Sequence, residues 1–298
     1  MASELSLLKP ALKPSSQASS LKEHEYAKGE GYRLYQGDSL ALMAEFEEQT
    51  FDLVFADPPY FLSNGGTTCQ SGKRVAVRKG AWDESRGHEE DFEFTRSWLK
   101  ACQRVLKPGG CIWVSGTQHV IFSVGYAMQS LDYKILNTIT WYKPNASPNL
   151  SCRYFTHSTE ILLWASPSHG KKLTHTFNYP VMKAENGGKQ MRDVWALPRP
   201  GDEELASDGG GRVWSQLGPR KDEKTFGKHP TQKPVALLTR ILQASTAEDA
   251  LVLDPFNGGG TTGVAALQNG RRYVGIDLDP AHLAMTQKRL EEVNARAS

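Results

Sequence analysis

The feature that most constrains the fold is the run 51–60, Phe-Asp-Leu-Val-Phe-Ala-Asp-Pro-Pro-Tyr. The four apolar residues at 53–56 are typical of a strand that is buried on both faces, as in a parallel sheet. The two prolines then end the strand, because neither can donate a backbone N–H to the ladder. The carboxylate of Asp57, the prolyl carbonyls and the ring of Tyr60 are left at the carboxyl end. We expect this edge to accept hydrogen bonds from a planar amine.

A second strand that ends in a polar loop is predicted far along the chain. Residues 251–254 form an apolar run that ends in an aspartate, a glycine-rich loop follows at 255–260, and a helix begins at Thr261. Strands that alternate with helices predict an α/β fold with a doubly wound, mostly parallel sheet. We expect a mobile N-terminal tail at 1–26 and a catalytic domain at 27–298. Periodicity fades at 166–228, which predicts an irregular insertion within that domain.

Composition narrows the class of protein. The chain of 298 residues is 23% charged and 39% hydrophobic, as in ordinary soluble globular proteins. It has no apolar run near the roughly 20 residues of a membrane span and no signal-peptide pattern, so we expect no membrane contact and an intracellular location. Its four cysteines form no CxxC pair, which favours free thiols and no metal site.

The net charge of +2 conceals one cationic stretch. Residues 61–82 contain Lys73, Arg74, Arg78 and Lys79 but no acidic residue. A solvated surface loop would explain four charges equally well. Because this stretch directly follows the predicted acceptor edge, it favours a polyanionic partner.

The glycine loop indicates which cofactor this chain binds. No lysine follows Gly260, where a phosphate-binding P-loop needs one. Asp254 would repel a pyrophosphate but suits a cationic ligand, and Asp277 ends the next strand, where an acidic residue can bind ribose hydroxyls. S-adenosylmethionine has a ribose, an ammonium and a sulfonium but no phosphate. It is therefore the predicted cofactor.

The run 57–60, Asp-Pro-Pro-Tyr, together with 254–262, Asp-Pro-Phe-Asn-Gly-Gly-Gly-Thr-Thr, resembles the amino-methylating DNA methyltransferases. The acceptor motif precedes the cofactor motif, as in the β group of that family, and the resemblance covers nearly all of 30–295. The stretches 149–160 and 188–191 are especially similar to the group of the second adenine methylase of the DpnII restriction system. The resemblance implies a methyltransferase fold with permuted motif order, in which 166–228 recognises the target sequence.

The resemblance also implies residue roles. Asp57 and the carbonyl of Pro58 would accept hydrogens from the target amine, next to Pro59, while Tyr60 would stack on the flipped base. Cofactor binding is expected from Asp38, Asp57, Lys233, Asp254, Phe256, Asn257, Gly258, Gly260, Thr261, Thr262 and Asp277. DNA contacts are expected from Lys73, Arg74, Arg78, Lys79, Lys189, Arg192, Arg199 and Arg212.

The predicted function is site-specific transfer of a methyl group from S-adenosylmethionine to N6 of a flipped adenine in DNA, directly and in line. Cytosine-N4 methylation uses the same acceptor geometry and is the alternative, although those enzymes more often carry Ser in place of Asp57. A dinucleotide-binding dehydrogenase and a catalytically silent DNA-binding regulator are the other hypotheses. Duplex DNA is the expected partner and single strands remain open. The resemblance is also compatible with a homodimer and with a cognate restriction endonuclease. The expected location is the cytoplasm of a prokaryote, with action at the nucleoid.

Overall fold

The computed structural model describes residues 21–63, 67–70, 73–76, 83–143, 146, 148–167, 174–196, 219, 223, 225–227 and 231–297. Its main sheet contains β1 (Glu25–Gly29), β2 (Tyr32–Gln36), β3 (Phe51–Ala56), β6 (Leu106–Gly116), β7 (Tyr133–Tyr142), β8 (Thr159–Pro167), β9 (Val194–Ala196), β10 (Leu251–Asp254) and β11 (Arg272–Asp277). The spatial order of these strands is β1-β2-β11-β10-β3-β6-β8-β7-β9. A separate hairpin pairs β4 (Thr67–Gln70) with β5 (Lys73–Ala76).

The sheet is parallel from β2 through β11, β10 and β3 to β6, while β8 and β7 continue it in antiparallel orientation. This arrangement confirms the predicted doubly wound, mostly parallel sheet. Strands β3 and β10 are direct neighbours, with Leu53 opposite Val252 and Val54 opposite Leu253. The two motifs that follow these strands therefore meet at one edge of the sheet, where open α/β sheets bind their ligands.

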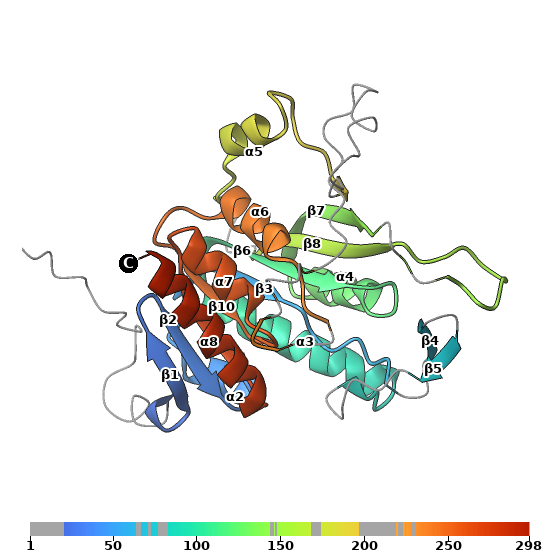
Figure 1. The fold of residues 1–298 in the computed structure, drawn as a ribbon, viewed down its shortest axis with the longest axis horizontal. Coiled ribbons are helices and arrows are strands. Elements are labelled where there is room, and N and C mark those ends of the chain that lie inside the picture. The colour runs from blue at the N-terminus through green and yellow to red at the C-terminus, as the bar shows by residue number, and fades with distance from the viewer. Residues whose placement is uncertain are drawn as a thin grey trace, which may run out of the picture.

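Helices cover both faces of the sheet, as Figure 1 shows. The helices are α2 (Ser39–Glu45), α3 (His88–Val105), α4 (Ile121–Ser130), α5 (Tyr179–Glu185), α6 (Val235–Ser245), α7 (Thr261–Gln268) and α8 (Pro280–Ala297). One core lies between the sheet and α2, α3 and α4, and the other lies beneath α6, α7 and α8. Strand β3 serves both cores, because Val54 belongs to the first and Leu53 to the second. This double burial explains its continuous apolar run.

The structure corrects the predicted start of the ordered domain. Leu21 is 1% exposed in the first core, and β1 already begins at Glu25, so the tail boundary at residue 26 was placed too late. The rest of the predicted tail, residues 1–20, lies outside the described residues. Helix α2 is capped by Asp38, which accepts a hydrogen bond from the Ala41 amide at 2.9 Å.

The predicted insertion is less irregular than expected where it is described. Strand β9 extends the sheet beside β7, and α5 is tied to α6 by an ion pair of 2.6 Å between Glu185 and Arg240. Residues 197–218 of the insertion lie outside the described residues. Among the helices that the structure describes, none is both long and apolar enough to cross a membrane.

We expect Leu21→Ala to lower the free energy of unfolding by about 2–5 kcal/mol, because it empties a buried site in the first core. The neighbouring exposed Lys22 provides a matched control, and Lys22→Ala should change this free energy by less than about 0.5 kcal/mol. Chemical denaturation of the two variants measures the difference. Equal stabilities would show that residues near 21 are part of the tail.

Candidate active site

The site begins where β3 ends, at Asp57. One carboxylate oxygen, Oδ1, accepts a hydrogen bond from the Tyr60 hydroxyl at 2.7 Å, and Oδ2 accepts one from the Lys233 ammonium at 2.6 Å. The Tyr60 hydroxyl also lies 3.1 Å from the Ser115 hydroxyl at the end of β6. Burial and the nearby Asp57 raise the pKa of Tyr60 well above its ordinary value, so the phenol stays protonated and donates. The acceptor edge is therefore held in place from three directions.

Lys233 supplies a buried cation directly before α6. Its side chain is 7% exposed, and its Nζ lies 3.7 Å from Oε2 of Glu160, whose other oxygen pairs with Lys143. Burial alone would lower the pKa of Lys233, but Asp57 and Glu160 outweigh it and hold this pKa above its usual value. The ammonium therefore stays charged. The sequence placed Lys233 near the cofactor but did not reveal its two carboxylate partners.

A buried carboxylate that sequence reasoning missed fixes the segment after the two prolines. Asp83 is fully buried and accepts the Tyr60 amide at 2.8 Å through Oδ1. Its Oδ2 accepts the Leu62 amide at 3.2 Å and the Ser63 hydroxyl at 2.9 Å. These bonds set the direction in which Tyr60 leaves the strand. Asp83 follows a stretch without regular periodicity, so no local pattern predicts this role.

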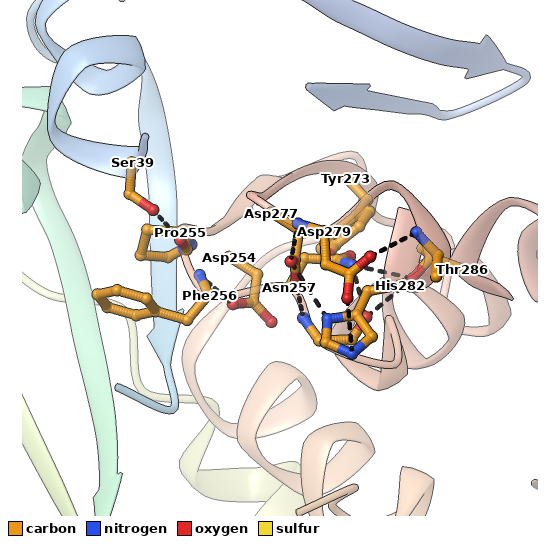
Figure 2. Close-up of polar contacts among 12 residues, drawn as sticks. Ser39, Asp254, Pro255, Phe256, Asn257, Tyr273, Asp277, Asp279, His282 and Thr286 are labelled. Atoms are coloured by element: carbon orange, nitrogen blue, oxygen red, sulfur yellow. Dashed lines mark hydrogen bonds and ion pairs between the residues drawn. The ribbon is translucent and has the colours of Figure 1, made fainter. Parts of the chain in front are cut away.

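The glycine loop is organised around Asp254, as Figure 2 shows. Its carboxylate accepts the Phe256 amide at 3.0 Å and the Thr262 hydroxyl at 2.6 Å, which joins the end of β10 to the first turn of α7. Burial raises the pKa of Asp254 to about 7, although both hydrogen bonds act to lower it. Neither partner is a cation. This carboxylate is therefore a buried acidic group that a cationic ligand would stabilise in its charged form.

Asp277 at the end of β11 lies on the other side of the loop. It accepts the Gly258 amide at 2.7 Å and the Asp279 amide at 2.9 Å, and it lies 3.2 Å from Nδ1 of His282. The hydrogen bond to Asp277 raises the pKa of His282. Figure 2 shows Asp277 and His282 facing each other beside the loop. The acidic group predicted to hold a ribose is thus pre-oriented.

Asn257 maintains the shape of the loop from within. Its Oδ1 accepts the Tyr273 hydroxyl at 2.8 Å, and its Nδ2 donates to the Thr286 hydroxyl at 2.9 Å. On the side that faces α2, the Ser39 hydroxyl donates to the carbonyl of Pro255. Figure 2 shows these contacts on opposite sides of Asp254. Elements from both ends of the chain therefore support one loop.

The acceptor edge and the glycine loop line a single pocket. Of the predicted site residues, the pocket brings together Asp38, Asp57, Pro58, Pro59, Tyr60, Lys233, Asp254, Phe256, Asn257, Gly258, Thr261, Thr262 and Asp277. Lining residues that the sequence did not indicate include Ser39, Leu40, Asp83, Gln232, Asp279 and His282. Gly260 is absent from the lining. It caps α7 in the left-handed conformation, with φ +69°, and packs against Thr286.

The structure describes only some of the predicted DNA-binding residues. Lys189 and Arg192 are exposed between α5 and β9. The backbone of Lys73 and Arg74 belongs to β5, which the prediction had treated as loop. Arg78, Lys79, Arg199 and Arg212 lie outside the described residues. Within the described part of the chain, His, Cys, Asp and Glu side chains form no group of three or more that could hold a metal ion.

Comparison with known proteins gives consistent matches over most of the chain. Residues 51–288 match a family described as DNA methylase. The chain is 48% identical over 261 residues to the type II methyltransferase M2.DpnII of Streptococcus pneumoniae, which covers 88% of this chain and 90% of that protein. It is 47% identical over 267 residues to M2.LlaDCHI of Lactococcus lactis subsp. cremoris, with 90% and 92% covered.

Two solved structures share the fold. The M1.HpyAVI–SAM complex matches with a TM-score of 0.60 at 23% identity and covers 87% of this chain and 98% of that one. The cytosine-N4-specific PvuII DNA methyltransferase matches with a TM-score of 0.63 at 17% identity, with 91% and 93% covered. At these identities the likeness concerns the fold alone.

Gly260→Ala should destabilise the protein more than Gly270→Ala. Both glycines have φ +69°, so both substitutions carry the left-handed strain of about 1–2 kcal/mol. A Cβ at Gly260 would lie 2.4 Å from Cγ2 of Thr286, whereas one at Gly270 meets nothing within 4 Å. We expect the clash to cost an additional 1–3 kcal/mol or so. Thermal unfolding of the two variants compares them, and equal losses would contradict the close packing of the loop on α8.

Proposed function

The chain belongs to the DNA methylase family, which matches residues 51–288, and we propose that it methylates N6 of adenine within that family. It is a site-specific DNA methyltransferase with S-adenosylmethionine as its cofactor, and the predicted resemblance to the second methylase of the DpnII system is confirmed. One observation carries the proposal: Asp57 and Asp254 line the same pocket from adjacent strands. An amine bound at Asp57 would face a cation bound beside Asp254.

The chemistry of the glycine loop suits this cofactor. S-adenosylmethionine supplies a methyl group that its sulfonium already activates for transfer. Asp254, whose carboxylate has no cationic partner among its two hydrogen bonds, would balance the positive charge of the ligand. Asp277 keeps acceptor capacity for ribose hydroxyls, because a carboxylate has about four lone-pair positions and its known contacts do not use all of them.

The acceptor edge would prepare the amine. The exocyclic nitrogen of adenine is a poor nucleophile, because its lone pair is conjugated into the ring. Asp57 and the carbonyl of Pro58 would each accept one N–H, which favours a more tetrahedral nitrogen with a free lone pair. Lys233 and Tyr60 each occupy one position on the Asp57 carboxylate and leave others open. These fixed contacts would position Asp57 before the base arrives, so that transfer depends on orientation.

The target base must leave the duplex to reach this pocket, at a cost of a few kcal/mol. Stacking on Tyr60, which is among the residues that line the pocket, would return about 1–3 kcal/mol. The side chains of Lys189 and Arg192 are exposed and would contribute phosphate contacts. Base flipping would thus be supported both by stacking on an aromatic ring and by contacts with the DNA backbone.

Cytosine-N4 methylation is the alternative for the same pocket, since cytosine also offers a conjugated exocyclic amine. The aspartate at position 57 favours adenine. Chemistry through a cysteine nucleophile finds no support at Cys102 or Cys111, because burial raises the pKa of both thiols, that of Cys111 to about 11. A silent DNA-binding regulator differs from the enzyme in one measurable outcome, which is the absence of any methylated product.

The biological setting follows from the relatives and is part of the proposal. The similar type II methyltransferases come from bacteria, which supports action on DNA in a bacterial cytoplasm. Both relatives are named type II methyltransferases, which is consistent with a restriction–modification system, so the proposal includes a cognate endonuclease. A homodimer stays a prediction, for which light scattering of the purified protein is the measurement.

Incubation of the protein with DNA and labelled S-adenosylmethionine should yield N6-methyladenine. Asp57→Ala should reduce this product by at least about 100-fold, as expected when a transition-state contact is removed, while Asp254, Asp277 and the rest of the glycine loop retain cofactor binding. Mass spectrometry of the digested nucleosides identifies the base. Glu90→Ala, which removes an exposed carboxylate on α3, is the control and should keep full activity. N4-methylcytosine as the sole product would contradict the assignment of adenine as the target base.

Cofactor affinity should rise with pH up to about 7. The free protein holds Asp254 with a pKa of about 7, and a cationic ligand favours the charged carboxylate. Binding must therefore release a proton at lower pH, and the affinity should change by up to about tenfold per pH unit below 7. Calorimetric titration from pH 5.5 to 8 measures this slope. Asp254→Asn should bind more weakly at pH 8 and lose the slope; an unchanged slope in that variant would contradict the assignment.

A further inference from the structure

The connection between β7 and β8, of which the structure describes residues 143, 146 and 148–158, carries Phe155, the most exposed aromatic side chain of the described residues. We call this segment the arm. Phe155 is 95% exposed and Tyr154 is 63% exposed. Single exposed apolar residues are common on protein surfaces and need no explanation. Two adjacent exposed aromatic rings on one short loop are less common, and the residues around them indicate which ligand they contact.

The turn that presents these rings is held by its own hydrogen bonds. Nδ2 of Asn149 donates to the Tyr154 carbonyl at 2.6 Å, and Oδ1 of Asn149 accepts the Ser151 amide at 3.0 Å. The Cys152 amide donates to the Asn149 carbonyl at 3.2 Å. The Tyr154 ring also packs against His157, with centroids 5.5 Å apart. The exposed position of Phe155 is therefore set by a formed turn.

The base of the arm is anchored beside the active site. The Lys143 amide donates to the Ser158 carbonyl at 2.7 Å, and Nε2 of His157 lies 2.8 Å from Nε2 of Gln118 on the neighbouring loop. Lys143 also pairs with Glu160, which in turn approaches Lys233. Figure 1 shows the arm projecting beyond the sheet on the same side as the β4–β5 hairpin. The exposed rings thus extend outward from the wall of the reaction pocket.

The charge of the arm fits a polyanion. Residues 143–158 contain no aspartate or glutamate, and of their two cations Lys143 pairs with Glu160 whereas Arg153 is exposed. Cations interleaved with exposed aromatic rings are typical of surfaces that bind single-stranded nucleic acid, where bases stack and phosphates pair with the cations. A protein partner could bind the aromatic rings alone, so it would not explain why the arm lacks acidic residues.

We propose that the arm binds the DNA strand beside the target nucleotide, with Phe155 stacked on an unpaired neighbouring base and Arg153 at a phosphate. This inference rests on the proposed function in one respect, that DNA is the substrate. It assigns a contact distinct from the target base itself, which Asp57 and Tyr60 would hold. Such a contact would favour single-stranded over duplex DNA, because only unpaired bases expose a face to Phe155.

Phe155→Ala should weaken binding of a single-stranded oligonucleotide by about 5- to 150-fold, the range for loss of one stacked base. Phe122 on α4 is 76% exposed, so Phe122→Ala removes a similarly exposed ring elsewhere and should change affinity by less than about twofold. Fluorescence anisotropy measures both. Cofactor affinity, unchanged in each variant, verifies the fold. Equal affinities for the two variants overturn the proposal, as does a change in oligomeric state with Phe155→Ala alone.

A second measurement reports stacking directly. An oligonucleotide with 2-aminopurine next to the target position should lose fluorescence on binding the wild-type protein and Phe155→Tyr, but not Phe155→Ala. Arg153→Ala should reduce the slope of log affinity against log salt concentration by about 0.7, the value for one phosphate contact on a single strand. Quenching that persists in Phe155→Ala refutes the stacking contact.

Failure of this proposal is distinguishable from failure of the proposed function. At saturating DNA, Phe155→Ala should still form the same methylated base as the wild-type protein. Normal product with unaltered affinity overturns only the role of the arm. Absence of product from the wild-type protein overturns the proposed function instead.

Discussion

The contact between the Lys233 ammonium and the Asp57 carboxylate is the interaction on which the site depends. It joins the end of β3 to the start of α6, two elements far apart in the chain, within a largely buried space. A buried charge that loses its partner is costly, often by several kcal/mol, so neither residue is independent of the other. Glu160 shares the ammonium at 3.7 Å, and Tyr60 completes the contacts of Asp57. The acceptor edge is thus rigid before any substrate arrives.

Two of the carboxylates that line the pocket, those of Asp57 and Asp254, lie in opposite electrostatic settings. Asp57 lies against a fixed cation, whereas Asp254 is buried with neutral donors, and burial raises its pKa to about 7. One carboxylate is already compensated and keeps spare acceptor positions, while the other lacks a counter-charge. Under the proposed function, this difference in charge would direct a neutral amine to Asp57 and a cationic ligand to Asp254.

Local sequence patterns predicted the parts of the fold that local forces determine. The apolar run of β3 and its two prolines located the acceptor edge, and the glycine loop after Asp254 located the second half of the pocket. The partners of Lys233 could not be predicted in this way, because the contact with Asp57 spans 176 residues and arises only when the sheet brings β3 and α6 together. Asp83 was missed for the same reason, since its role depends on the path of residues 60–63.

The pocket depends on which strands are neighbours in the sheet, whatever their order along the chain. Strand β3 lies beside β10, and Nδ2 of Asn294, near the end of α8, donates to the carbonyl of Glu30 in the turn between β1 and β2 at 3.0 Å. The last helix and the first hairpin are therefore in contact. A circularly permuted chain, joined across that contact and opened in a surface connection elsewhere, would rebuild the same pocket with the methyl-donor half first. The order of the two motifs along the chain then reflects evolutionary history, because the chemistry requires only that β3 and β10 are neighbours in the sheet.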